Sequence, residues 1–147
     1  MKSIAGRLVC LLLFIAPAAR AQDDTAGVRR AALDYIEGFY EGDSTKLVRS
    51  VHPTVTKFGY YIPRGQEAYT GEPMSYQAMM DFANAVAANP ARKARPDAPK
   101  EVTIYEVQDQ TASAKVVAWW GTDYLLLGKY DGKWMIVHVL WQSPPRG

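Results

Sequence analysis

Residues 111–142 read TASAKVVAWWGTDYLLLGKY, then DG, then KWMIVHVLWQ, and this stretch decides the fold. Both apolar runs are rich in β-branched and aromatic residues, which is typical of strands. Asp131-Gly132 separates the runs, and Asp-Gly is a preferred two-residue hairpin turn. The sequence therefore predicts an antiparallel hairpin that turns at Asp131-Gly132, and it predicts that the first run bends or splits near Gly121.

The predicted hairpin also fixes which side chains share a face of the sheet. A two-residue turn pairs Leu127 with Ile136 and Leu125 with His138, and side chains alternate between the faces along each strand. Asp123 and His138 then become diagonal neighbours, about 7 Å apart at the backbone. The two predicted faces are Asp123, Leu125, Leu127, Trp134, Ile136, His138 and Leu140 on one side, and Thr122, Tyr124, Leu126, Met135, Val137, Val139 and Trp141 on the other.

Residues 1–21 have the pattern of a cleavable secretory signal peptide. A basic start precedes an unbroken apolar run over residues 8–16, which is too short to span a bilayer. Ala19-Arg20-Ala21 fits a small-x-small cleavage site. We expect a periplasmic or secreted protein with one mature domain over residues 22–147; the alternative is an uncleaved N-terminal anchor.

The composition of the mature chain excludes several classes of function. The one cysteine, Cys10, lies in the predicted signal peptide, so disulfides, cysteine nucleophiles and thiolate metal sites are excluded after cleavage. Cleavage also removes Lys2, Arg7 and Arg20, which changes the formal net charge from +2 to −1. A nearly neutral chain gives no electrostatic reason to expect binding to nucleic acid or to an anionic membrane.

The rest of the chain predicts helices before strands. Apolar residues at helical spacing indicate the first and third helices, and Gly42 and Pro53 end the first and second. Helices segregated from an antiparallel sheet define the α+β class. The expected elements are helices over residues 25–41, 44–51 (capped by Asp43 or Ser44) and 76–88 (capped by Ser75), a short strand over 54–62, a loop over 63–73, and strands over 102–107, 111–130 and 133–142.

This order of elements resembles the nuclear transport factor 2-like (NTF2-like) superfamily, and within it the putative lumazine-binding branch. The resemblance is carried by AALDYIEGFYEGD at residues 31–43, Val51-His52-Pro53, Met74-Ser75, TDYL at 122–125 and DGKWMIV at 131–137. It implies the cone fold shared with SnoaL-like proteins, ketosteroid isomerase and scytalone dehydratase. In that fold three N-terminal helices pack on a curved, mainly antiparallel sheet, and the outer sheet face commonly forms a homodimer.

The resemblance also implies that Trp134 and Ile136 point into the cone, which would place Asp123 and His138 on the cavity wall. A carboxylate beside an imidazole can orient it, raise its pKa and make it a proton shuttle. The alternative is a structural carboxylate that accepts hydrogen bonds from Tyr or Trp, with a histidine satisfied locally. His52 is either a group at the mouth of the cone or a histidine favoured by a helix C-terminus.

We therefore expect an exported protein that binds a small molecule in an aromatic pocket, without cofactor or metal. One alternative is a ketosteroid isomerase-like or dehydratase-like enzyme in which Asp123 and His138 are the acid-base pair. Another is an interaction module that binds a protein through its sheet. The predicted pocket residues are Tyr35, Phe39, His52, Asp123, Trp134 and His138.

Overall fold

The structure, a computed structural model, describes residues 17–145, so most of the predicted signal peptide lies outside the described residues. Within that range no helix is both long enough and apolar enough to cross a membrane. The elements are α1 (Pro17–Glu41), α2 (Ser44–Ser50), β1 (Val51–Tyr61), β2 (Thr70–Pro73), α3 (Tyr76–Ala88), a short 3₁₀ turn η1 (Pro90–Arg92), β3 (Glu101–Val107), β4 (Thr111–Ala118), β5 (Gly121–Tyr130) and β6 (Lys133–Gln142).

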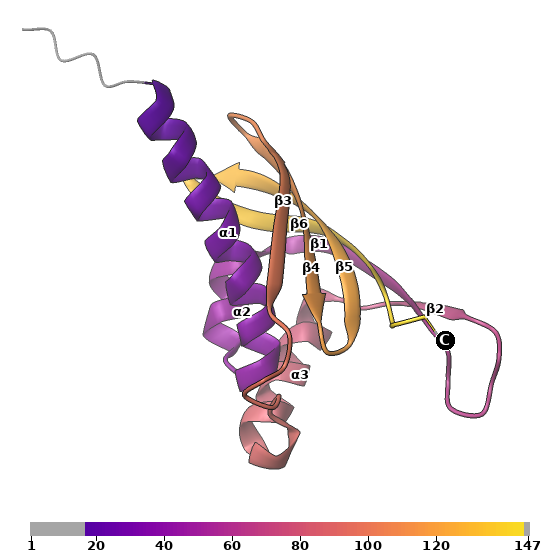
Figure 1. The fold of residues 1–147 in the computed structure, drawn as a ribbon. Coiled ribbons are helices and arrows are strands. Elements are labelled where there is room, and N and C mark those ends of the chain that lie inside the picture. The colour runs from indigo at the N-terminus through magenta and orange to yellow at the C-terminus, as the bar shows by residue number, and fades with distance from the viewer. Residues whose placement is uncertain (1–16, 146–147) are drawn as a thin grey trace, which may run out of the picture.

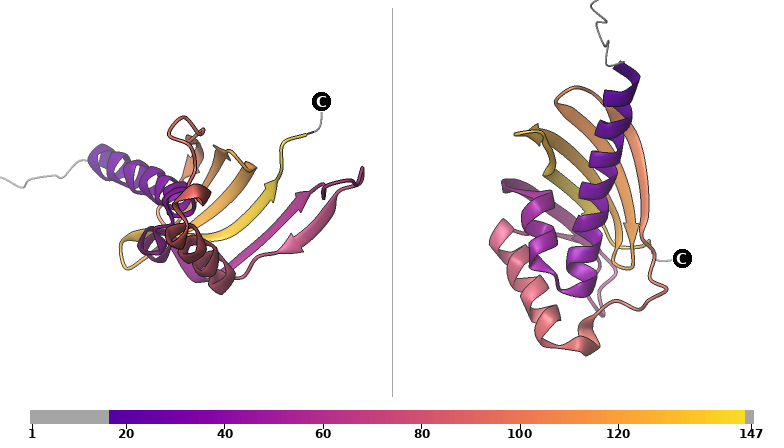
Figure 2. Two further views of the ribbon diagram at one scale, coloured as in Figure 1. Left: turned by 90° about the horizontal axis from the view of Figure 1, so that it is seen from below. Right: turned by 90° about the vertical axis from the view of Figure 1, so that its left-hand side faces the viewer.

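The three helices lie together on one side of a curved sheet (Figures 1 and 2). The six strands follow the order β2-β1-β6-β5-β4-β3, in which β1 and β6 run parallel and every other neighbouring pair is antiparallel. This arrangement confirms the predicted α+β class, with helices on a mainly antiparallel sheet. The hairpin of β1 and β2 extends away from the helices (Figure 1).

Local signals in the sequence fix the helix boundaries. Gly42 has a φ of 74°, and a Cβ there would lie 2.4 Å from the backbone nitrogen of Ala87, so this turn requires glycine where α1 meets α3. The Asp43 carboxylate accepts a hydrogen bond from the Thr45 N–H at 3.0 Å and caps α2. Ser75 caps α3 in the same way. The predictions at these turns are confirmed.

The boundaries differ from the predictions in three places. α1 begins at Pro17 rather than near residue 25, and β1 begins directly after α2 at Val51. The segment over residues 70–73, predicted as part of a loop, is strand β2, because it pairs with the end of β1. The predicted split near Gly121 is confirmed, and it separates β4 from β5.

The hairpin of β5 and β6 turns at Asp131-Gly132 as predicted, but its register changes once. Leu127 pairs with Ile136 as expected, whereas Leu126 pairs with His138, so Val137 has no partner and forms a β-bulge. A one-residue shift moves every later side chain to the opposite face. The predicted placement of His138 beside Asp123 is therefore wrong.

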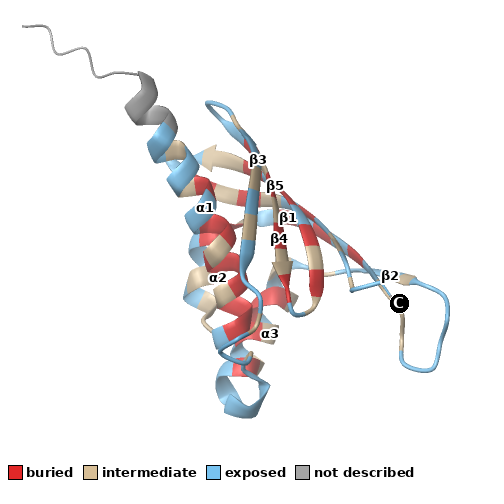
Figure 3. Cartoon of the chain, viewed as in Figure 1, coloured by how far each residue is buried: buried red, intermediate tan, exposed pale blue. Residues whose placement is uncertain are grey.

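The core lies between the helices and the concave sheet face, where buried residues gather on both layers (Figure 3). The helices contribute Tyr35, Ile36 and Met79, each with no exposed surface. The sheet contributes Leu125 and Ile136 among others. Burying a large apolar side chain stabilises the fold by roughly 1.5–3 kcal/mol, so these two layers hold each other in place.

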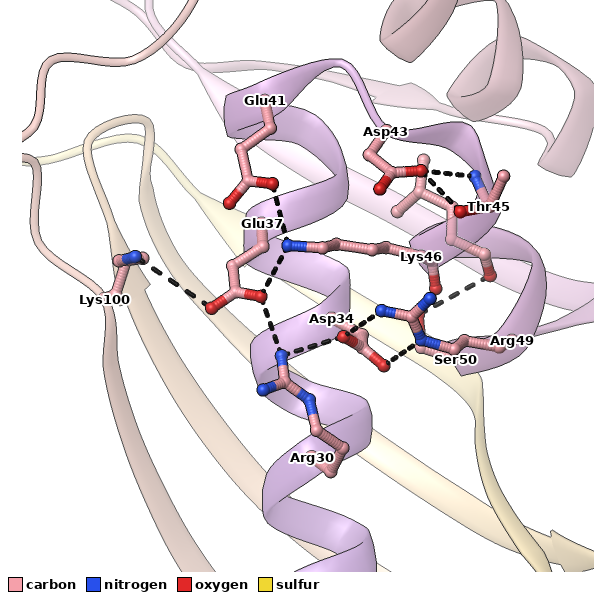
Figure 4. Close-up of polar contacts among 11 residues, drawn as sticks. Arg30, Asp34, Glu37, Glu41, Asp43, Thr45, Lys46, Arg49, Ser50 and Lys100 are labelled. Carbon is pink, nitrogen blue, oxygen red and sulfur yellow. Dashed lines mark hydrogen bonds and ion pairs between the residues drawn. The ribbon is translucent and has the colours of Figure 1, made fainter.

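An ionic network joins α1 to α2 (Figure 4). The carboxylate of Asp34, which is 2% exposed, accepts two hydrogen bonds from the Arg49 guanidinium at 2.6 and 2.8 Å, and Arg30 lies 2.8 Å away. Lys46 of α2 pairs with Glu37 of α1 at 2.9 Å. Two-point arginine–carboxylate pairs are directional as well as strong, so this network fixes the angle between the two helices.

Candidate functional site

The central residue of the candidate site is Lys57, which lies on the concave face of the sheet. Val55, Lys57 and Gly59 alternate inward along β1, and only 8% of Lys57 is exposed. Lys57 pairs with Val139 of β6, and Asp123 lies on β5 beyond β6. Neighbouring strands are about 4.8 Å apart, so only a long side chain reaches across β6 from β1 to β5.

The Lys57 ammonium meets a fully buried carboxylate and a fully buried phenol. The hydroxyl of Tyr35, from α1, donates a hydrogen bond to Asp123 Oδ2 at 2.6 Å. Lys57 Nζ donates to the same Tyr35 oxygen and lies 3.5 Å from Asp123 Oδ2. Trp120 Nε1 donates to the other carboxylate oxygen at 2.7 Å. Asp123 thus joins a helix, the β4–β5 turn and β1.

Burial controls the ionisation of two of these groups. It raises the pKa of the Tyr35 phenol well above its usual range, and the neighbouring Asp123 carboxylate raises it further, so the hydroxyl keeps its proton. It lowers the pKa of the Lys57 ammonium, although the Asp123 carboxylate acts in the opposite direction. The site therefore combines a hydroxyl that stays protonated and donates a hydrogen bond with an amine that loses its proton more readily than a surface lysine.

The β4–β5 turn carries two tryptophans and is held by α1. The Tyr40 hydroxyl accepts a hydrogen bond from the backbone N–H of Trp119 at 2.8 Å and donates one to the Pro99 carbonyl. Its ring also packs edge-on against Trp120, with centroids 5.4 Å apart. These contacts aim Trp120 at Asp123 and leave Trp119 at the surface, 55% exposed.

A pocket of about 250 Å³ opens above this network. Aromatic rings form most of its wall, and several pack edge-to-face, such as Phe39 with Phe82 at 5.7 Å and with Trp120 at 5.6 Å. Such walls suit flat, apolar ligands. The lining residues are Phe39, Lys57, Glu72, Met74, Phe82, Arg92, Trp119, Trp120 and Trp141.

Gly59 makes room for one wall of this pocket. A Cβ at Gly59 would lie 1.7 Å from Nε1 of Trp141, so the indole lies across the bare backbone of β1. The Trp141 ring also stacks on Tyr61, with centroids 6.3 Å apart and planes 7° apart. The indole centroid is 5.9 Å from Lys57 Nζ, and both residues line the pocket.

The structure brings three of the six predicted pocket residues together. Phe39 lines the pocket, and Tyr35 and Asp123 lie in the polar network beneath it. Asp123 has the second of the two arrangements considered from the sequence, a buried carboxylate bonded to Tyr and Trp donors. Its role in binding a ligand stays a prediction.

The other three predicted pocket residues lie elsewhere. His138 is exposed on the convex face beside Thr56, because the bulge at Val137 reverses its direction. His52 stacks on Tyr130 at 4.2 Å, at the start of β1.

Trp134 is buried, but its indole N–H donates to Asp24 Oδ1 at 3.0 Å near the N-terminal part of α1, away from the pocket.

Because His138 lies on the convex face and Asp123 on the concave face, the two side chains do not form an acid-base pair in this structure. The described residues contain no group of three or more His, Cys, Asp or Glu side chains that could hold a metal ion.

Sequence reasoning missed Lys57, Trp120 and Trp141 as parts of one site. β1 reads VTKFGYY over residues 55–61, and its aromatic residues suggest that Phe58 faces the core and Lys57 faces water. The structure has the reverse. The available signal was Gly59, two residues from Lys57 on the same face, because a glycine inside a strand often marks the close approach of another group.

Three helices on a curved sheet, with a buried polar group and an aromatic pocket on the concave side, define an NTF2-like domain. The chain belongs to the family described as "Putative lumazine-binding", whose pattern matches residues 23–142. The comparison with curated proteins found no match.

Solved structures share this fold. An NTF2-like protein of unknown function from Shewanella baltica OS155 is 23% identical, with a TM-score of 0.64 over 85% of this chain and 97% of that one. An NTF2-like protein of unknown function from Methylobacillus flagellatus KT is 25% identical, with a TM-score of 0.62 over 84% and 94%. A putative scytalone dehydratase from Novosphingobium aromaticivorans DSM 12444 is 12% identical, with a TM-score of 0.58 over 87% and 89%.

The buried pair predicts strongly non-additive stability effects. Asp123→Asn leaves the Lys57 ammonium buried without its counter-charge, which typically costs about 3–5 kcal/mol of unfolding free energy. Lys57→Met should cost less, because Tyr35 and Trp120 still donate to Asp123. The double variant should be more stable than the sum of the two losses predicts.

Urea unfolding of the four proteins measures this coupling, with Asp109→Asn, at an exposed turn carboxylate, as the control. The control should change stability by no more than about 0.5 kcal/mol. Additive losses at Lys57 and Asp123 would contradict a direct electrostatic interaction between them.

Proposed function

We propose that this chain is an exported protein that binds one small, planar and largely neutral molecule in the aromatic pocket. The pocket itself is the observation that carries the proposal, since aromatic walls stand above a buried hydrogen-bonding group. Natural ligand sites have the same composition, mostly apolar surface with a few fixed polar groups.

The size of the pocket limits the ligand. Its volume of about 250 Å³ is just below the range of about 300–1,000 Å³ that is usual for drug-sized ligands. A molecule of one or two fused rings suits that space. Phe39 packs edge-to-face on both Phe82 and Trp120, and all three rings line that space.

The charges around the pocket favour a neutral ligand. Lys57 is already offset by Asp123 at 3.5 Å. At the lining, Arg92 and Glu72 contribute one charge of each sign. A ligand with a full charge would add an unpaired ion to an apolar site, which is costly, whereas a carbonyl oxygen would accept a hydrogen bond from Lys57.

The enzymatic alternative, with Asp123 and His138 as an acid-base pair, has no geometric support here. The two side chains lie on opposite faces of the sheet. Proton transfer between a catalytic pair requires heavy-atom distances of about 2.6–3.2 Å or one bridging water. Binding without that reaction is therefore the function we propose.

We further propose that the protein is a homodimer through the convex sheet face. Cross-strand partners on this face are Phe58, Leu140 and Tyr124, which are 37%, 43% and 53% exposed. His138 and Leu126 form the neighbouring row. Soluble monomers rarely expose such contiguous apolar patches, and a second copy would cover this one.

Ligand binding can be tested with 2-naphthol, a neutral two-ring compound, by ligand-observed saturation-transfer NMR. We expect transfer to the naphthol protons with the native chain. Met74→Trp narrows the pocket and should abolish most of that signal, while Met135→Trp, at a half-buried methionine outside the lining, should not. Equal signals from both variants would show that 2-naphthol binds elsewhere.

Dimer formation can be tested by size-exclusion chromatography with light scattering at micromolar concentration. The native chain should elute at twice the monomer mass. Leu126→Lys places a charge on the convex face and should yield monomers, because a desolvated charge opposes burial of the face. Val48→Lys, at a similarly exposed position on α2, is the matched control. A monomeric native chain would refute the dimer.

Export can be tested by expressing the full chain in a Gram-negative host and measuring the intact mass in the periplasmic fraction. Cleavage after Ala21 predicts a mature protein that begins at Gln22. A full-length protein that stays in the membrane fraction would support the uncleaved anchor instead.

A further inference from the structure

The amine of Lys57 has the environment of a reactive group. Aromatic rings surround it, with Nζ 5.0 Å from the centroid of Tyr35, 5.2 Å from that of Phe39 and 5.9 Å from that of Trp141. Its side chain lines the pocket, so a bound molecule can meet it. By contrast, Lys46 lies outside the pocket and forms ion pairs with Glu37 and Glu41.

Holding the carboxylate does not require this amine. Trp120 and Tyr35 already donate one hydrogen bond to each oxygen of Asp123, at 2.7 and 2.6 Å. A buried ammonium is costly, and lysine is the residue that proteins use when an amine must become neutral and nucleophilic. The burial that lowers the pKa of Lys57 favours that neutral form.

We propose that Lys57 condenses reversibly with the carbonyl group of a small aromatic aldehyde or ketone bound in the pocket. This inference rests on the proposed function, since the pocket must first bind the aromatic part. It narrows the ligand class to neutral carbonyl compounds. The negative charge of a carboxylate ligand would be repelled by Asp123, which lies 3.5 Å from the amine.

The condensation balances without a co-reactant. The lone pair of the neutral amine forms a bond to the carbonyl carbon, and the carbonyl π electrons move to oxygen, which takes one proton from the nitrogen to give a neutral carbinolamine. Loss of the hydroxyl as water, together with one N–H proton, leaves an imine. The net change is amine plus carbonyl to imine plus water, with no oxidation or reduction.

Two neighbours have positions that assist these steps. The Tyr35 hydroxyl donates its one proton to Asp123 and accepts a hydrogen bond from Lys57, so it fixes the position of the amine at the base of the pocket. The Asp123 carboxylate, 3.5 Å from Nζ, stabilises the cation of a protonated imine. Tyr35 is therefore a positioning residue for the amine.

Reductive trapping tests the inference with benzaldehyde as the probe. The full chain is incubated with benzaldehyde and cyanoborohydride at pH 7, and intact mass and peptide mapping then locate the benzyl group. Lys57 should be modified at least about tenfold faster than exposed Lys133, because binding places the carbonyl beside the amine. Tyr35→Phe should slow trapping while benzaldehyde still binds.

The controls separate this inference from the proposed function. Lys57→Met should lose the fast modification, and Lys129→Met, at a partly buried lysine outside the pocket, should keep it. Peptide mapping of the benzyl group on the native chain still tests the inference if the Lys57→Met variant does not fold. If saturation transfer shows bound benzaldehyde but Lys57 reacts no faster than Lys133, the condensation is refuted and the binding function stands. If neither benzaldehyde nor 2-naphthol binds, both fail.

Discussion

The concave side of this protein is organised around one fully buried carboxylate. Asp123 receives hydrogen bonds from Tyr35 on α1 and from Trp120 in the β4–β5 turn, and Lys57 on β1 lies 3.5 Å away. An unpaired carboxylate in this position would cost several kcal/mol, so the two hydrogen-bond donors Tyr35 and Trp120 must hold their places. The same requirement positions the floor and one wall of the pocket.

Helix α1 supplies the residues that connect this floor to the walls. Tyr35 and Phe39 are four residues apart and so lie on the same helix face, with ring centroids 5.1 Å apart. Tyr40, one position further, holds the turn that carries Trp119 and Trp120. Helical periodicity in the sequence predicted the helix face that carries Tyr35 and Phe39. Their place in a pocket with Asp123 was predicted separately, from the resemblance to the cone fold and from the aromatic content of the chain.

The strand register of the β5–β6 hairpin could be predicted from the sequence only in part. The Asp131-Gly132 turn determines the register near the loop, and it was predicted from two residues because few dipeptides adopt that turn. The bulge at Val137 could not be predicted, because β6 is apolar on both faces: a strand with Val139 and Trp141 inward is as hydrophobic as one with Leu140 inward. Alternation fixes register only where the two faces differ in polarity.

Lys57 was missed for a related physical reason. Hydrophobic patterning places Phe58 inside and a lysine outside, and it assumes that the sheet has one wet face. Here the convex face carries Phe58 and Tyr124 while the concave face holds an ion pair. Exposing apolar side chains on the convex face and burying charges on the concave face both cost stability. Natural proteins tend to break local rules of this kind at functional sites. The reversed polarity of the two faces is the observation behind both proposals, a partner surface on the convex side and a ligand that meets the lysine on the concave side.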